Sequence, residues 1–300
     1  MGNNAFGFVV LHYLDFEMTK QCVLNILENC HKYNIKIVIV DNASQNGSGE
    51  NLKKYFEYEH RITVIINEEN LGFANGNNVG YEYLKKFEYI NFIIILNNDV
   101  LIKQNNFLDT VVLLYQRKHF SVLGPDIYNP IEKKHQNPSR TEPLNLCQIE
   151  RLYKTLDERN NHYLKYFIKK VLLNLIKRDK NFIKNSEGYD REQTNVVLHG
   201  ACYIFSADYI LKRNKAFNAE TFLYLEEEII YFECVKSDLQ ILYSPEIIVY
   251  HLEDVSTKKA FKTSYFREKM ITENKLHSTE VLLKLVSNME KKNEKKDNND

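Results

Sequence analysis

The stretch Tyr89-Ile90-Asn91-Phe92-Ile93-Ile94-Ile95-Leu96-Asn97-Asn98-Asp99-Val100 decides the fold of this chain. An apolar run this short and this rich in isoleucine predicts a strand that is buried on both faces of a parallel sheet. The run ends at Asn97, Asn98 and Asp99, and open α/β sheets bind ligands at the carboxyl ends of their strands. An aspartate flanked by amide oxygens suits a hard divalent cation that also holds phosphate oxygens. An ordinary Asn/Asp turn is the alternative that this stretch alone leaves open.

The first hundred residues alternate between strand and helix patterns. Three short apolar runs predict strands, and each is followed by helical spacing: 8–11 with 19–32, 35–40 with 51–58, and 62–66 with 76–86. Repeated βα units form a parallel sheet with right-handed crossovers. We therefore expect an α/β fold.

The composition excludes several classes of protein. The 300 residues suffice for one large or two modest domains. Lys and Arg (40) balance Asp and Glu (40), so no net charge favours nucleic acid, and we expect no such partner. The five cysteines form no Cys-x-x-Cys pair, which indicates reduced thiols rather than a disulfide framework or a zinc site. Because no basic leader and no apolar run of about 18 residues is present, we expect a cytoplasmic protein.

Residues 130–195 differ in character from the chain before them. Three prolines interrupt regular structure, and residues 151–184 then show a basic helical pattern. The apolar side chains of this pattern fall on one face: Leu164, Phe167, Ile168, Val171, Leu172, Leu175 and Ile176. Such a helix is typical either of a membrane surface or acceptor contact, or of an insert that packs its apolar face on the domain and keeps its lysines in water.

The chain after residue 195 returns to strand patterns and then ends in helix. The sequence predicts, in order, a strand at 196–206 that is interrupted at 199–201, an acidic segment between apolar flanks at 222–235, and a last strand at 241–250. Helical spacing covers 258–289. A charged, apolar-poor composition predicts a disordered tail over 290–300.

Polar residues follow the second predicted strand. Asp41 ends this strand, and Asn42 and Ser44 follow it. An aspartate at a strand end can accept a hydrogen bond from the imide of a uracil or thymine ring, or from a ribose hydroxyl. An Asx turn with helix capping explains the same residues equally well.

The segment 70–80 holds three glycines and four asparagines at the start of a predicted helix. Glycines let backbone N–H groups approach an anion, and a helix amino terminus favours negative charge, so this segment predicts a phosphate contact. It is not a Walker loop, because no Gly-Lys-Ser/Thr follows, and it does not follow the first strand as a dinucleotide fingerprint does. A flexible turn with a helix cap is the alternative.

Several motifs in chain order together carry a resemblance to a known family. They are Val9-Val10-Leu11-His12-Tyr13, Ile37-Val38-Ile39-Val40-Asp41-Asn42-Ala43-Ser44, Asn70-Leu71-Gly72-Phe73-Ala74-Asn75-Gly76-Asn77-Asn78, Leu96-Asn97-Asn98-Asp99, Gly200-Ala201-Cys202, Phe222-Leu223-Tyr224-Leu225-Glu226-Glu227 and Val249-Tyr250-His251. They closely resemble the family 2 glycosyltransferases of the GT-A fold, in particular the rhamnosyltransferase-like branch of bacterial surface-polysaccharide synthesis. The resemblance covers most of residues 6–256.

The resemblance implies a Rossmann-like, mostly parallel central sheet with helices on both faces, a helical insert and C-terminal helices. The GT-A domain would cover 1–257 and the C-terminal helical region 258–289. Within the domain, the implied parts are a nucleotide-binding half at 1–100, the basic insert at 130–195, and an acceptor and catalytic half at 196–257.

Carried over residue by residue, the resemblance implies a donor site. Asp41 would contact the nucleotide base, and the first strand would line the same pocket. Asn70, Gly72 and Asn75 would lie near the nucleotide and its phosphates. The residues implied to bind the donor nucleotide are, in chain order, Val10, His12, Asp41, Asn42, Asn70, Gly72, Asn75, Asn97 and Asn98.

The resemblance also implies a metal site. Asp99 matches the last position of the family's DxD-type motif, which binds Mg²⁺ or Mn²⁺ and the diphosphate. Asn97 stands where that motif usually begins with Asp, and its amide oxygen remains a hard ligand. His251 matches the histidine that completes the metal site, although the glycine usual after it is absent here. A purely structural histidine is the alternative.

Glu226 and Glu227 match a catalytic Glu-Asp pair in which the second carboxylate is the general base. Inverting transfer needs such a base, because the acceptor hydroxyl loses its proton as the anomeric bond of the donor breaks. The cation offsets the charge on the departing diphosphate. The family pattern has another Asp two residues later, where this chain has Ile229, and this departure bears on the acceptor contacts.

We therefore expect an inverting, metal-dependent glycosyltransferase that takes a sugar from a UDP- or dTDP-type nucleoside-diphosphate sugar. The acceptor would be a glycan or polyprenol-linked glycan of capsule, O-antigen or lipopolysaccharide synthesis. The basic insert would contact the inner face of the cytoplasmic membrane. Two alternatives stay open: an inactive relative that serves as a scaffold subunit, and a sugar nucleotidyltransferase. The latter class carries a Gly-rich basic loop after the first strand, where this chain has His12-Tyr13-Leu14-Asp15.

Overall fold

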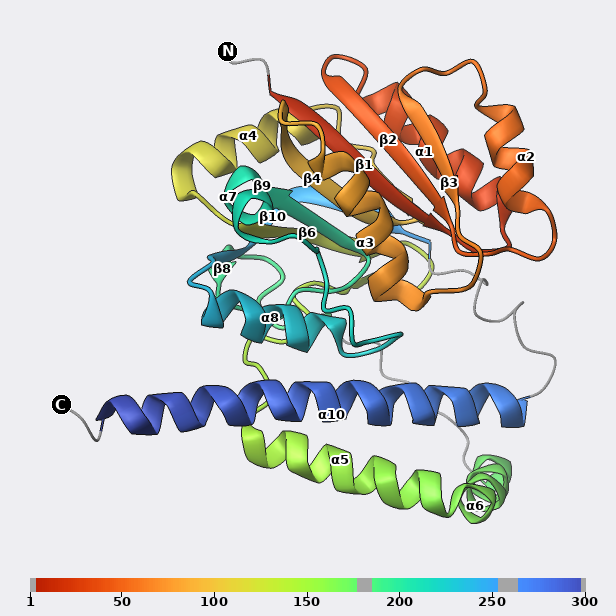
Figure 1. The fold of residues 1–300 in the computed structure, drawn as a ribbon, viewed down its shortest axis with the longest axis vertical. Helices are drawn as coiled ribbons and strands as arrows, with labels where there is room; N and C mark the ends of the chain where they lie inside the picture. Colours follow the sequence, from red (N-terminus) through yellow and green to blue (C-terminus); the bar gives the residue numbers. More distant parts are fainter. Residues whose placement is uncertain (1–3, 177–184, 253–263, 298–300) are drawn as a thin grey trace.

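A mixed β-sheet lies at the centre of the protein (Figure 1). The computed structural model describes residues 4–176, 185–252 and 264–297. The strands are β1 (Ala5–His12), β2 (Asn34–Asp41), β3 (Ile62–Ile66), β4 (Ile90–Asn97), β5 (Val100–Leu101), β6 (Val122–Asn129), β7 (Lys134–His135), β8 (Gln193–Thr194), β9 (Cys202–Ser206) and β10 (Ile241–His251). Their spatial order is β3-β2-β1-β4-β9-β6-β10-β5, with β7 beside β6 and β8 beside β10.

The first four long strands pair in parallel, as do β6 and β10. Strand β9 runs antiparallel between β4 and β6, and short antiparallel strands flank β6 and β10. The predicted α/β class is therefore confirmed. The strand predicted at 196–206 is wrong in its first part, because only residues from Cys202 onward pair with β4.

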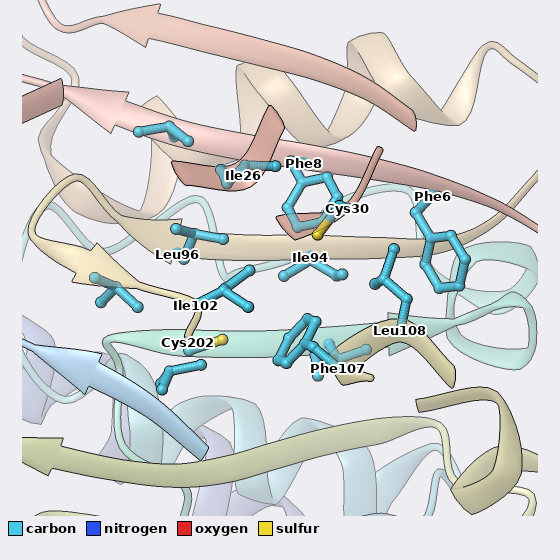
Figure 2. Packing of buried hydrophobic residues seen from close by; sticks show 14 of the residues in the cluster. Phe6, Phe8, Ile26, Cys30, Ile94, Leu96, Ile102, Phe107, Leu108 and Cys202 are labelled. Atoms are coloured by element: carbon cyan, nitrogen blue, oxygen red, sulfur yellow. The ribbon is translucent and has the colours of Figure 1, made fainter. Parts of the chain in front are cut away.

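The side chains of β4 alternate between two apolar clusters, one on each face of the sheet. Ile94 and Leu96 point to one face and Ile93 and Ile95 to the other, and all are at most 1% exposed. Figure 2 shows the cluster on the first face. That face packs against α1 (Phe16–Asn29), α2 (Ser48–Tyr55) and α4 (Phe107–Lys118), and the other against α3 (Gly72–Lys85), α7 (Ala207–Lys212) and α8 (Glu226–Lys236).

A layer of long helices lies beyond α8 (Figure 1). It consists of α5 (Leu146–Asn161), α6 (Tyr163–Ile176) and α10 (Ser264–Asp297), and α10 contacts both α5 and α8. Ile229 of α8 is 1% exposed in a cluster with Ile149 of α5 and Val281 and Leu282 of α10. The apolar residue at position 229 is therefore explained by the helical layer, which needs it for packing.

The basic helix predicted at 151–184 is two helices. Helix α5 ends at Asn161, the second of two asparagines of low helix propensity, and the backbone of His162 leaves the helical region. The predicted apolar face, which lies on α6, is only partly buried. Phe167 packs against Tyr265 at 5.0 Å between ring centroids, whereas Leu164 and Ile168 are 62% and 52% exposed. The rest of that prediction, at 177–184, lies outside the described residues.

Helix α10 is longer at its end than the pattern indicated. The prediction of a disordered tail is wrong for 290–297, because α10 continues to Asp297. Lys and Glu are good helix formers, so a helix can extend past its last packed apolar side chain. The predicted helix start at 258–263 falls outside the described ranges. Of the helices within those ranges, none combines the length and hydropathy that crossing a membrane requires.

We predict that Ile229→Asp, which restores the family's residue type, lowers the free energy of unfolding by about 3 kcal/mol or more, because it buries a charge in an apolar cluster. The conservative variant Ile229→Val should cost about 1 kcal/mol. Urea unfolding measures both. Equal stability of wild type and Ile229→Asp would contradict the packing described here.

Candidate active site

The carboxyl ends of β1, β2 and β4 meet at one edge of the sheet. His12 pairs with Asp41 across β1 and β2, and Leu11 pairs with Asn97 across β1 and β4. His12 Nε2 lies 3.8 Å from Asp41 Oδ1. The structure thus brings together the strand-end residues that the sequence predicted, at the edge where such sheets bind ligands.

A polar network under this edge holds a neutral histidine. Asn98 Nδ2 donates to Thr19 Oγ1 (2.9 Å), which is 2.7 Å from His12 Nδ1, and His12 Nε2 is 2.7 Å from Ser48 Oγ. Because Ser48 Oγ donates to Asn46, the ring donates from Nε2 and accepts at Nδ1. Burial lowers the pKa of His12, against the opposing effect of Asp41. His12 therefore connects α1 and α2 to this edge of the sheet through Thr19 and Ser48.

Asp41 is only 2% exposed, and the loop after β2 covers it. The Ser44 N–H donates to both of its carboxylate oxygens at 3.3 Å. A Cβ at Gly49 would lie 2.2 Å from Asp41 Oδ2, so the start of α2 can press against the carboxylate only because residue 49 is glycine. The sequence analysis left two alternatives for the residues after β2, a contact with the nucleotide base and an Asx turn. The structure contains the turn.

Two residues predicted to bind the nucleotide, Val10 and Asn42, are buried and make contacts within the protein. Val10 is fully buried in the apolar cluster on the α1 face. Asn42 is 3% exposed, and its amide oxygen and nitrogen both bond within the protein. Its Nδ2 donates to Asn70 Oδ1 and the Gly72 carbonyl, and its Oδ1 accepts from Asn67 and the Leu71 N–H. This leaves Asn42 as the residue that fixes the 67–72 loop.

The segment 70–80 is hydrogen-bonded to residues 219–222, and its first N–H groups already have acceptors. The Gly72 N–H donates to Asn70 Oδ1, and the Phe73 N–H donates to the Phe222 carbonyl at 2.7 Å. Asn75 Nδ2 donates to the Ala219 carbonyl. Because these groups are used, the prediction of phosphate on this helix start is not supported by the geometry.

The glycines of this segment permit close packing. Gly72 has φ +75°, and a Cβ there would lie 2.1 Å from the Phe222 carbonyl oxygen. A Cβ at Gly80 would lie 2.4 Å from Val9 Cγ1, so α3 can lie directly on β1. Close packing of Gly72 against Phe222, and of Gly80 against Val9, therefore accounts for these two glycines.

Asp99 and His251 form a pair that suits a cation. His251 Nε2 lies 3.3 Å from Asp99 Oδ1, and His251 Nδ1 lies 2.9 Å from Gln136 Oε1. An amide oxygen only accepts, so Nδ1 donates to Gln136, and Nε2 is the ring atom that faces the carboxylate. Imidazole nitrogen and carboxylate oxygen are both ligands that divalent cations bind.

The distance between these two ligand atoms fits a divalent ion. Two ligands at right angles on an ion with bonds of about 2.1 Å lie about 3 Å apart. A metal-bound histidine usually donates its other N–H to a neighbouring oxygen, as His251 does to Gln136. Within the described ranges no group of three or more His, Cys, Asp or Glu could hold a metal.

The turn at His199 and Gly200 connects this pair to the acidic helix start. The His199 ring contacts the His251 ring, with centroids 5.8 Å apart. The Gly200 N–H donates to the Glu227 carboxylate, and a Cβ at Gly200 would lie 2.9 Å from Glu227 Oε1. The Ala201 carbonyl accepts from the Asn97 N–H. Burial and the neighbouring His251 ring lower the pKa of His199 to about 3, so this ring is neutral.

The three glutamates at the start of α8 have different surroundings. Burial and the Glu227 charge raise the pKa of Glu226 to about 8, and Glu226 Oε1 has no hydrogen-bond partner among the described residues. Burial also raises the pKa of Glu227, although the Gly200 N–H and Lys275 oppose this. Glu228 instead pairs with Arg140 at 3.1 Å. Burial raises the pKa of Glu228 as well, although the Leu144 N–H and Arg140 oppose this.

A strained turn that α10 holds in place precedes these glutamates. Tyr224 and Leu225 have φ of +78° and +63°, a conformation that non-glycine residues adopt at a cost of about 1–3 kcal/mol each. Ser278 Oγ donates to the Leu223 carbonyl at 3.1 Å. Lys275 Nζ lies 5.0 Å from the centre of the Tyr224 ring. The helical layer thus fixes the position at which Glu226 and Glu227 enter the site.

Sequence reasoning missed Gln136 and Lys275 as members of this site. Neither lies in a motif, and Gln136 is 115 residues from its partner His251. The sequence contains one local signal for Gly200, which is a glycine within a strand pattern. Such a glycine often marks a place where other atoms approach the backbone closely.

The comparisons with known proteins agree with this geometry. Residues 8–184 match the family described as Glycosyl transferase family 2, so the chain belongs to that family. Glycosyltransferase GlyG of Streptococcus pneumoniae serotype 4 is 31% identical over 109 residues, which are 36% of this chain and 34% of that protein. Glycosyltransferase GlyA of the same organism is 23% identical over 205 residues, 62% of this chain and 28% of that protein. The chain thus spans about a third of the length of these relatives.

Two solved structures share the fold. The mannosyltransferase PcManGT from Pyrobaculum calidifontis, in complex with GDP-Man and Mn²⁺, superposes with a TM-score of 0.51 at 11% identity over 94% of this chain and 72% of that one. GalNAc-T7 with UDP, GalNAc and Mn²⁺ gives a TM-score of 0.53 at 13% identity over 83% and 44%. At these identities the likeness concerns the fold alone, which is GT-A.

The raised pKa of Glu226 predicts a pH-dependent stability. Between the ordinary value of 4.5 and about 8, folded Glu226 keeps a proton that the unfolded chain has released, so the free energy of unfolding falls as pH rises through this window. In Glu226→Gln this contribution is absent. We expect the variant to gain stability relative to wild type as pH increases from 5 to 9, measured by urea unfolding at each pH. The exposed control Glu220→Gln should run parallel to wild type, and a parallel curve for Glu226→Gln would contradict the assignment.

Proposed function

We propose that this chain is a metal-dependent, inverting glycosyltransferase that uses a nucleoside-diphosphate sugar. The observation that carries the proposal is the His199–Gly200 turn, which contacts His251 on one side and the Glu227 carboxylate on the other. The two proposed cation ligands, Asp99 and His251, and the half-buried Glu227 carboxylate are thus connected by this one turn. Inverting transfer requires these two groups on opposite sides of the sugar.

In the proposed reaction, Glu227 takes the proton from the acceptor hydroxyl as that oxygen forms a bond to the anomeric carbon. The bond from this carbon to the diphosphate breaks at the same time, and its electron pair stays on the diphosphate oxygen. A single displacement of this kind inverts the anomeric centre. Burial favours the task of Glu227, because a base is most effective when its pKa lies near the working pH.

Asp99 and His251 would hold Mg²⁺ or Mn²⁺, and Gln136 would orient the histidine. A cation bound there supplies positive charge opposite the departing diphosphate. Likeness to two folds solved with Mn²⁺ and nucleotide or nucleotide sugar supports this choice of donor class. We infer a UDP- or dTDP-type sugar as donor. For the acceptor we infer the hydroxyl of a glycan, free or polyprenol-linked, in bacterial surface-polysaccharide synthesis, as the sequence resemblance implies.

The two alternatives find less support. The departure at Ile229, which suggested an inactive scaffold, is accounted for by packing against α5 and α10. A nucleotidyltransferase needs a Gly-rich basic loop after the first strand, and β1 is followed here by Tyr13, Leu14 and Asp15. Release of pyrophosphate instead of a nucleoside diphosphate would favour the nucleotidyltransferase.

The base assignment predicts that Glu227→Gln lowers turnover about 100-fold or more, because the amide cannot accept the proton. Donor binding should persist, since the side chain faces the acceptor. The measurements are nucleoside-diphosphate release and donor-induced thermal shift, each with Mn²⁺. Glu220→Gln, an exposed change in the preceding loop, serves as control. Full turnover by Glu227→Gln would refute the assignment.

The cation assignment predicts that Asp99→Asn weakens Mn²⁺ binding about tenfold or more, because it removes the charged ligand beside His251. A thermal-shift panel of UDP-, dTDP- and GDP-sugars with and without Mn²⁺ measures the effect. In the wild type, Mn²⁺ should enhance the donor-induced shift, and in the variant this enhancement should disappear. Asp157→Asn on α5 is the matched control. An unchanged metal response in Asp99→Asn would place the cation elsewhere.

A further inference from the structure

The junction of α5 and α6 forms a basic groove that the proposed reaction does not use. The groove measures about 580 Å³, and its lining includes Arg159, His162, Lys165 and Lys169 against one acidic residue, Glu158. Arg159 lies over the Tyr166 ring at 4.3 Å. Among the described residues, none forms an ion pair with Arg159, Lys165 or Lys169, whereas Lys170 on the same helix pairs with Glu268.

Large apolar side chains stand exposed on α6 and at the start of α10, which packs against α6. Leu164 is 62% exposed and Ile168 is 52% exposed, both on α6. Phe266 at the start of α10 is 66% exposed. Its neighbour Tyr265 packs against Tyr163 with ring centroids 5.2 Å apart, so the start of α10 lies against α6.

The spacing along α6 places apolar and basic residues in adjacent stripes. Leu164 and Ile168 are four residues apart and form one stripe, and Lys165 and Lys169 form the next, about 100° around the helix. Apolar side chains flanked by lysines are the pattern of helices that lie in the headgroup region of a bilayer. We propose that this surface, defined by Leu164, Lys165, Ile168, Lys169 and Phe266, docks on a membrane that contains anionic phospholipids.

Charge favours a lipid surface over the other occupants. A second copy of the chain would bring the same unpaired cations to the contact, and like charges repel. A free anion in the groove would satisfy the cations but leave Leu164, Ile168 and Phe266 in water. An anionic bilayer satisfies both groups, since its phosphates meet the cations and its upper acyl region takes the apolar side chains. Docking needs neither sugar donor nor acceptor, so it stands apart from the proposed function.

The test is co-sedimentation of the full chain with vesicles, without any sugar nucleotide. We expect binding to mixed phosphatidylcholine and phosphatidylglycerol vesicles at least about tenfold stronger than to phosphatidylcholine alone, and weaker binding as salt rises. Leu164→Ser/Ile168→Ser and Lys165→Gln/Lys169→Gln should each lower binding about tenfold. The controls are Leu211→Ser, at a side chain 81% exposed on α7, and Lys53→Gln/Lys54→Gln on α2, and neither should change it.

Thermal unfolding of each variant checks that the fold is intact. The proposal is overturned if the wild type ignores anionic vesicles, if the control variants lose binding equally, or if the chain self-associates through this surface in light scattering. It is also overturned if inorganic phosphate abolishes sedimentation while the apolar variants bind normally, because the groove would then be a free-anion site. Since no transfer is measured, failure here leaves the proposed function untouched.

Discussion

The hydrogen bond from the Gly200 N–H to the Glu227 carboxylate is the contact on which the site depends. It ties the helix that supplies the base to a turn that also touches His251 and, through the Ala201 carbonyl, the Asn97 backbone beside Asp99. A Cβ at position 200 would lie 2.9 Å from Glu227 Oε1, so the glycine lets the carboxylate approach this turn closely. The proposed base, Glu227, and the proposed cation ligands, Asp99 and His251, are thereby connected through one turn.

The helical layer explains the apolar residue at position 229 and fixes the loop before Glu226. Helix α10 packs Val281 and Leu282 against Ile229, places Lys275 over Tyr224, and bonds the loop before Glu226 through Ser278. These contacts hold a turn with unfavourable backbone angles at the point where two carboxyl groups become buried. Strain and buried charge both cost free energy, and the packing of α8 between the sheet and α10 offsets that cost.

Much of the fold was predictable because its signals are local. The run ending at Asp99 contains its own burial pattern, and the structure confirms it in β4. The site was harder to predict than the fold. Asparagines and glycines that contact the protein's own backbone cannot be distinguished in sequence from those that bind phosphate. Asn42 bonds to the Gly72 carbonyl and Gly72 packs against Phe222, and neither contact could be predicted from the sequence. Gln136 left no local signal, since its partner is 115 residues away.

The proposed mechanism requires that Asp99 and His251 bind one cation at the donor diphosphate and that the donor sugar faces Glu227. A crystal structure grown with Mn²⁺ and an unreactive nucleoside-diphosphate sugar, with data at the manganese absorption edge, tests this directly. We expect an anomalous peak for an ion that Asp99 Oδ1 and His251 Nε2 bind. The diphosphate should bind the same ion, and the sugar should lie between the diphosphate and Glu227. A peak away from this pair, or a donor whose anomeric carbon is remote from Glu227, would contradict it.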